Sequence, residues 1–174
     1  MSEKSMNREG LMILCDYDTY ANHLVLETIA KLNEDEFTGE SSPSHHSVRK
    51  LILHALEAEK YFLSLCQERL FQELPDLHSV TDIRSHWAQV EHDIQGWIAA
   101  ANEDDLKREV PFRLKGQSLQ FPKWQLLMQA FFHCAQHRSE LSVVLTQLGH
   151  PLPNLDIILH FIEQNKNESN NIGT

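Results

Sequence analysis

The sequence has few of the residues that interrupt helices. Only six of its 174 residues are glycine and six are proline. Because these residues break helices and mark tight turns, their scarcity leaves room for long helices and favours a helical fold. At this length we expect one globular domain with a hydrophobic core of its own.

Cysteines and long apolar runs are also scarce. The three cysteines, Cys15, Cys66 and Cys134, are an odd number with no CxxC spacing, which favours reduced thiols over a disulfide framework. No segment has the apolar length of a membrane span, and residues 1–14 lack the apolar stretch of a signal peptide. We therefore expect a cytoplasmic protein with no membrane partner.

Basic residues are outnumbered by acidic ones. The chain has 15 lysines and arginines against 25 aspartates and glutamates, which gives a formal net charge of -10 at pH 7. Nucleic-acid binding requires clustered basic side chains that contact phosphates. We therefore expect no nucleic-acid partner.

Helical periodicity, by contrast, is abundant. Apolar residues recur every three or four positions in four segments, which predicts helices over 14–32, from Ser44 or Ser47 to before Pro75, over 79–101, and over 122–148. Residues 33–43 read as a solvated loop. Between the last two long helices, alternating apolar residues predict a short hairpin or extended crossover. A short C-terminal helix that docks on the bundle is expected around 155–161. The prediction is an all-α four-helix bundle over residues 1–165, with a disordered tail over 166–174.

Eleven histidines are the unusual feature of the composition. His54 continues an apolar stripe of its helix, and His133 and His137 lie on a stripe of theirs, one turn apart. At 3.6 residues per turn, His133 and His137 lie about 40° apart around the helix and their imidazoles can converge. About one such pair is expected by chance, so the spacing alone decides nothing. An imidazole at an interior position needs a hydrogen-bond partner or a metal, and the pattern leaves both interpretations open.

Three neutral imidazoles would leave a coordination position of a metal ion open, as in reactive sites. An ion held in this way lowers the pKa of a bound water or thiol. Zn(II), Ni(II), Fe(II) and Mn(II) all accept nitrogen ligands, so the sequence does not choose among them. Glu140 lies near the same stripe as a partner or an alternative ligand, although Glu57, Arg138 and Glu140 are all interpreted first as solvated charges. The remaining histidines are predicted to be solvated: His23, His45, His46, His78, His86, His92, His150 and His160.

Four stretches of the sequence resemble motifs of one family in the same order. They are Tyr17–Asn22, Leu53–His54, His133–Arg138 and Leu148–Asp156. Together they resemble the DinB/YfiT-like metalloenzymes, which are unrelated to the polymerase that shares the first name. Asp18, Tyr20 and Ser139 differ from the residues usual in the family, and these differences concern packing and substrate more than the ligands.

The resemblance implies an up-down-down-up bundle that binds one divalent metal ion through His54, His133 and His137. It also implies a homodimer, and an activity as an S-transferase that joins a low-molecular-weight thiol such as mycothiol, bacillithiol or glutathione to an electrophile, or as a related hydrolase. The alternative is a non-catalytic stress-response or interaction protein whose metal site is structural or vestigial.

Overall fold

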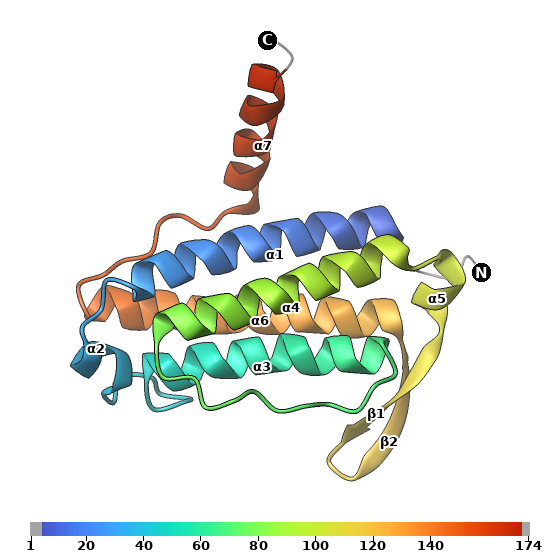
Figure 1. The fold of residues 1–174 in the computed structure, drawn as a ribbon, viewed down its shortest axis with the longest axis horizontal. Helices are drawn as coiled ribbons and strands as arrows, with labels where there is room; N and C mark the ends of the chain where they lie inside the picture. The colour runs from blue at the N-terminus through green and yellow to red at the C-terminus, as the bar shows by residue number, and fades with distance from the viewer. Residues whose placement is uncertain (1–4, 172–174) are drawn as a thin grey trace.

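The computed structural model of the chain describes the backbone of residues 5–171 and the side chains of residues 5–167. Four long helices lie side by side (Figure 1). They are α1 (Arg8–Ile29), α3 (Val48–Cys66), α4 (Val80–Ala100) and α6 (Lys123–Gln147). The most extensive contact is between α3 and α6, and α1 packs on both α4 and α6. The chain is therefore mostly helical, as predicted.

The ends of the long helices follow from their capping residues. Ser47 caps α3 by accepting a hydrogen bond from the backbone N–H of Lys50 at 3.2 Å, and Ser79 caps α4 in the same way. Both caps agree with the predicted helix starts. Two predicted ends were wrong: α1 begins six residues earlier, at Arg8, and α3 already ends at Cys66. Beyond α3, an irregular segment over 67–79 runs back along the bundle to α4 (Figure 1).

Two short helices occupy segments that apolar periodicity does not mark. Helix α2 (Glu34–Thr38) lies in the predicted solvated loop, and α5 (Glu103–Lys107) follows α4. Each begins with a capping box, formed by Asn33 in α2 and Asn102 in α5. The loop prediction over 33–43 was wrong at this point, because one turn of helix needs a cap but no apolar stripe.

The predicted hairpin is confirmed. Strands β1 (Glu109–Leu114) and β2 (Gln117–Pro122) form a two-stranded antiparallel sheet between α5 and α6. The turn consists of Lys115 and Gly116, which both adopt positive φ angles, of 48° and 80°. This backbone geometry matches the right-handed twist of the flanking strands.

The final helix, α7 (Ile157–Asn171), extends into the predicted tail. Residues 172–174 of that tail lie outside the described residues. Figure 1 shows α7 pointing away from the bundle, so the predicted docking is limited to its beginning. There the His160 ring lies 4.8 Å from the ring of Tyr20 and its side chain is buried, which corrects the prediction of a solvated histidine. Within the described residues, no helix combines the length and apolar character needed to cross a membrane.

Candidate metal centre

The three predicted ligand residues meet where α3 packs on α6. The Nε2 atom of His133 lies 3.1 Å from Nε2 of His54 and 3.1 Å from Nε2 of His137. A nitrogen of each of the three lies within 4.8 Å of the others. In a tetrahedral site with metal–nitrogen bonds of about 2.1 Å, two ligand nitrogens are about 3.4 Å apart. The spacing in the protein therefore fits a single ion.

The site lies at the edge of the bundle and not in its core. His54, His133 and His137 are all half-buried. The buried face of α3 is instead formed by its neighbours, among them Leu51 and Ala55. The prediction that His54 lies on the interior face of its helix was therefore wrong, because the buried face is turned by a fraction of a turn from it. As a result, the three histidines are partly exposed to solvent.

The imidazoles of this cluster are held in the neutral state. Burial, followed by the neighbouring imidazoles, lowers the pKa of His54 and of His133. For His137 the same causes lower the pKa to about 4, against a smaller opposing effect of Glu140. Since a neutral imidazole keeps a lone pair on its ring, the cluster is ready to bind a cation at neutral pH.

A fourth histidine lies at the same place, which sequence reasoning missed. The ring of His45 is stacked on that of His54, with centroids 4.3 Å apart, and meets the ring of His137 edge-on at 5.1 Å. His45 is half-buried, so the prediction that it is solvated was wrong. It lies on an irregular segment before α3, where no periodicity indicates direction. Glu140 accepts hydrogen bonds from the Ser42 and Ser44 hydroxyls of this segment. Its carboxylate, one nitrogen of His45 and one of His137 form a second group that could hold a metal ion, so both roles considered for Glu140, partner and alternative ligand, stay open.

Behind the histidines, a network of buried polar groups joins α1, α3, α4 and α6. The Nη1 atom of Arg138 donates to Asp18 and to the amide oxygen of Asn22, both at 2.6 Å. Asn22 in turn donates to Glu59 at 3.1 Å, and the Trp87 indole donates to the other oxygen of Glu59 at 2.9 Å. Interpreting Arg138 as a solvated charge was therefore wrong.

The charges of this network balance within the core. Burial, together with the nearby Asp18 carboxylate, raises the pKa of Glu59 well above its usual range, whereas Arg138 stays charged and pairs with Asp18. Asp18, Glu59 and the Cys134 thiol also lie close together. The Asp18 carboxylate is already paired with the Arg138 guanidinium. It is therefore not free to bind a cation together with Glu59 and Cys134.

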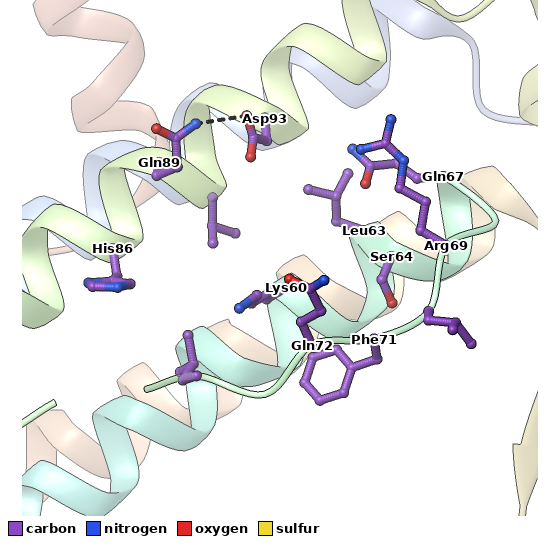
Figure 2. Close-up of a pocket in the computed structure, with 13 residues that line it drawn as sticks. Lys60, Leu63, Ser64, Gln67, Arg69, Phe71, Gln72, His86, Gln89 and Asp93 are labelled. Atoms are coloured by element: carbon purple, nitrogen blue, oxygen red, sulfur yellow. Dashed lines mark hydrogen bonds between the residues drawn. The ribbon is translucent and has the colours of Figure 1, made fainter. Parts of the chain in front are cut away.

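Two of the cavities that α3 lines are formed together with the segment over 67–79. One, of about 460 Å³, lies between α3, the segment over 67–79 and α4. Figure 2 shows Gln89 and Asp93 of α4 across this cavity from Lys60 and Ser64 of α3, and none of the three clustered histidines lines it. The other is a cleft of about 340 Å³ lined by His54 itself, with Leu53, Glu57 and residues 74–77. His54 is the member of the histidine cluster that lines this cleft.

Known proteins share both the sequence pattern and the fold of this chain. A sequence profile described as the DinB family matches residues 1–168. Among solved structures, a DinB-like protein from Bacillus subtilis is similar, with 18% identity, a TM-score of 0.63, and 82% of this chain and 96% of that chain covered. A DinB-like protein from Bacillus cereus ATCC 10987 has 19% identity and a TM-score of 0.61, with 78% and 91% covered. These two likenesses concern the fold. No curated protein matches the chain.

Proposed function

The chain belongs to the DinB family, and we propose that it binds one divalent metal ion through His54, His133 and His137 and uses it in a thiol S-transfer or a related hydrolysis. The ion is Zn(II), Ni(II), Fe(II) or Mn(II), all of which accept nitrogen ligands.

The observation that carries the proposal is the position of the His133 Nε2 atom. It lies 3.1 Å from two other Nε2 atoms at once. A neutral imidazole nitrogen has either one proton or one lone pair, so it makes one directed hydrogen bond and not two. Three nitrogens directed at a common ion account for both short distances, which favours metal ligands over histidines satisfied by one another.

The accessibility of the cluster supports a reactive site over a closed structural one. When bound, a divalent ion with three nitrogen ligands lowers the pKa of a thiol or water at its open position, which produces a nucleophile at neutral pH. The chain itself contributes the half-buried setting of the histidines and the cleft beside His54. That cleft is where we place the thiol or its electrophilic partner.

Metal binding is tested first, on protein purified without a histidine tag. We expect elemental analysis to find about one divalent ion per chain in the wild type and none in His133→Ala. The matched control is His92→Ala, because His92 is exposed and lies on a different helix, α4. A free metal ion at 100 times its dissociation constant stabilises the folded protein by about 2.7 kcal/mol. For a chain of this size, the Tm of the metal-loaded protein should therefore be about 5–11 °C above that of the metal-free protein. A wild type that contains no ion and binds none on titration refutes the proposal.

The transferase activity needs a separate test. The metal-loaded protein is mixed with a panel of low-molecular-weight thiols and a model electrophile, and loss of free thiol is followed. We expect turnover that disappears in His54→Ala while the fold, followed by circular dichroism, persists. A protein that binds metal, loses stability without it and turns over none of the panel supports the alternative of a non-catalytic interaction protein with a structural ion.

We also propose the remaining features that the family resemblance implies. The long segment over 67–79, which runs back along the bundle in Figure 1, supports an up-down-down-up order of the helices within a single domain over 1–165. Phe132 and Val143, which are 55% and 58% exposed, lie three turns apart on one face of α6 and support a homodimer through this face. Light scattering of the wild type and of Phe132→Glu tests the dimer. The free thiols of the cysteines support a cytoplasmic location.

A further inference from the structure

A further cavity, of about 430 Å³, lies where the hairpin packs on the two helices that carry the histidines. Strand β1 contacts α3 and strand β2 contacts α6, and Figure 1 shows the hairpin at one end of this helix pair. Phe62 of α3 and Leu126 of α6 contribute buried side chains to the lining. Phe112 of β1 and Phe121 of β2 are half-buried and line it from the hairpin. The cavity has the size of a small-molecule site.

The lining of this aromatic cavity suits an aromatic ring. The Phe112 ring lies 6.0 Å from the Phe62 ring, at an angle of 22°, and 5.8 Å from the Phe121 ring, which it meets edge-on. Aromatic rings attract one another in both of these arrangements. The polar groups of the lining are the amides of Gln125 and Gln129, and none of the described residues that line it is charged. A small aromatic or similarly apolar molecule therefore fits this cavity better than an ionic one.

Helices α3 and α6 both lead from the histidine cluster to the aromatic cavity. The Cys134 thiol donates to the Ala55 carbonyl at 3.4 Å, and the Cys66 thiol donates to the Lys123 carbonyl at 3.6 Å. The two helices are therefore antiparallel. On the way from the histidines to the hairpin, residue numbers rise along α3 and fall along α6.

The aromatic cavity also lies close to the faces of these helices that carry the histidines. On α6, Leu126 is seven residues from His133, which places it about 20° around the helix and about 10 Å along it. Gln129 is only one turn from His133. On α3, Phe62 is two turns from His54, about 12 Å along the helix. A molecule about 10 Å long would therefore extend from the cavity to the histidines.

The cleft beside His54 reaches the cluster from the other side of α3. Leu53 and Glu57, which line the cleft, are turned from His54 by about 100° and about 60° in one sense around the helix. Phe62, which lines the aromatic cavity, is turned by about 80° in the opposite sense. His54 thus stands between the two spaces, so two substrates would not compete for the same one.

We propose that the aromatic cavity binds the apolar part of the electrophilic substrate, while the thiol reaches the ion from the cleft beside His54. The substrate class is then an elongated molecule with an aromatic or similarly apolar group about 10 Å from its reacting atom. Ala58 is half-buried, one turn from both His54 and Phe62, and its small side chain takes up little of the space between them. The inference rests on the proposed function, since it names the second substrate of the same site.

The first measurement tests the aromatic cavity in the metal-free, full-length protein. The probe is N-phenyl-1-naphthylamine, an uncharged molecule whose fluorescence rises in an apolar pocket. Gln129→Trp places a larger side chain in the lining, and we expect it to raise the dissociation constant of the probe about tenfold, the loss of apolar contact with one or two methylene groups. The matched control is Gln147→Trp, the same change at an exposed position of α6 outside the lining, which should leave the constant unchanged.

A second pair of variants decides the result if Gln129→Trp does not fold. Leu114→Asp introduces a charge at a lining residue that is 49% exposed, and it should also raise the dissociation constant of the probe about tenfold. The control is Leu70→Asp, because Leu70 is 93% exposed and lines the cavity between α3 and α4 instead. The Tm of each variant shows that it is folded.

The second measurement tests the link to the ion, in the Co(II)-loaded protein. Two thiols are compared, butane-1-thiol and 4-phenylbutane-1-thiol, and their binding is followed by the sulfur-to-cobalt charge-transfer band. We expect the added ring to tighten binding about tenfold or more in the wild type. Ala58→Leu narrows the space between the two ends and should remove most of this gain, with the affinity for butane-1-thiol within about threefold of the wild type. Ala99→Leu, at an exposed position of α4, is the control.

The outcomes are distinct. Unchanged affinity for the fluorescent probe in folded Gln129→Trp and Leu114→Asp, or a loss in Leu70→Asp instead, overturns the inference. Equal affinity of the wild type for the two thiols also overturns it, because the aromatic cavity would then not serve the metal site. A wild type that binds the fluorescent probe in this cavity but binds no Co(II) refutes the proposed function, and confirms the cavity only as a separate binding site. A gain from the ring that is lost in Gln129→Trp and in Ala58→Leu supports both.

Discussion

Replacing Asp18 with alanine removes the partner of the buried Arg138. The two side chains are 4% and 6% exposed, and their oxygen and nitrogen lie 2.6 Å apart. Arginine stays protonated in proteins, so the variant cannot relieve the buried charge by losing a proton. Within the part of the chain that the structure describes, the Asn22 amide oxygen, also at 2.6 Å, is the acceptor that the guanidinium keeps.

The cost follows from this geometry. Breaking a buried ion pair by removing one partner costs about 3–5 kcal/mol. At about 2–4 °C for each kcal/mol in a chain of this size, the Tm should fall by about 6–20 °C. A smaller effect opposes the loss, because the Asp18 carboxylate is one of the causes that raise the pKa of Glu59. Without it Glu59 ionises more readily and can supply part of the missing negative charge.

The assay is equilibrium unfolding in urea of the metal-free protein, with a fixed m-value as evidence that only stability changed. The control is Asp76→Ala, which removes a carboxylate that is 77% exposed and pairs with Arg49, and which should cost no more than about 1 kcal/mol. The double variant Asp18→Ala, Arg138→Met should recover part of the loss, since no unpaired charge is left in the core. If Asp18→Ala is as mild as Asp76→Ala, the buried Arg138 charge does not depend on Asp18 for its stability.

Three further predictions concern titration and the core. Burial and its neighbours lower the pKa of His137 to about 4, so the unfolded chain binds its proton more readily and the stability of the metal-free protein should fall as pH drops from about 6.5 to about 4; thermal unfolding in EDTA should show a shallower fall in His137→Gln. Glu91 raises the pKa of His23 through a hydrogen bond at 3.0 Å, so this histidine contributes stability below about pH 6.5 that is lost as pH rises through its raised pKa, and the difference between wild type and His23→Gln should shrink from pH 6 to pH 8. Trp87→Phe removes the indole donor of Glu59 and should cost about 1–3 kcal/mol in urea unfolding.

Apolar periodicity predicted the elements whose stability depends on one apolar face. The seam of α4 and the start of α6 after Pro122 were predicted to within a residue or two, and the hairpin follows from alternation around Lys115 and Gly116. Helix α1 was predicted less well: its start at Arg8 was missed by six residues, and its buried face includes Asp18 and Asn22, which an apolar stripe does not mark. A search for apolar residues does not find such polar positions. Their burial depends on Arg138, which lies some 120 residues away in the sequence.

The residues of the candidate site also fall into two groups, those that the sequence could predict and one that it could not. The pair His133 and His137 could be found because a helix places residues four apart on one face. His45 could not be found, because its position depends on hydrogen bonds between an irregular segment and Glu140. The spacing of residues in the sequence indicates which side chains are neighbours on one helix. It does not indicate which loop will hydrogen-bond to a carboxylate far away in the sequence.

The buried network and the candidate metal centre lie on adjoining faces of α6. Successive residues are turned by about 100°, so Cys134 and Arg138 lie on the face next to that of His133 and His137. One face is buried, where the Cys134 thiol donates to the Ala55 carbonyl at 3.4 Å and Arg138 binds α1; the other is half-buried and directed at α3. Rotating α6 to turn the histidines away from His54 would pull the guanidinium out of its pair with Asp18. The ion pair of Arg138 with Asp18 therefore helps to hold the rotation of α6 about its axis, and with it the direction of His133 and His137.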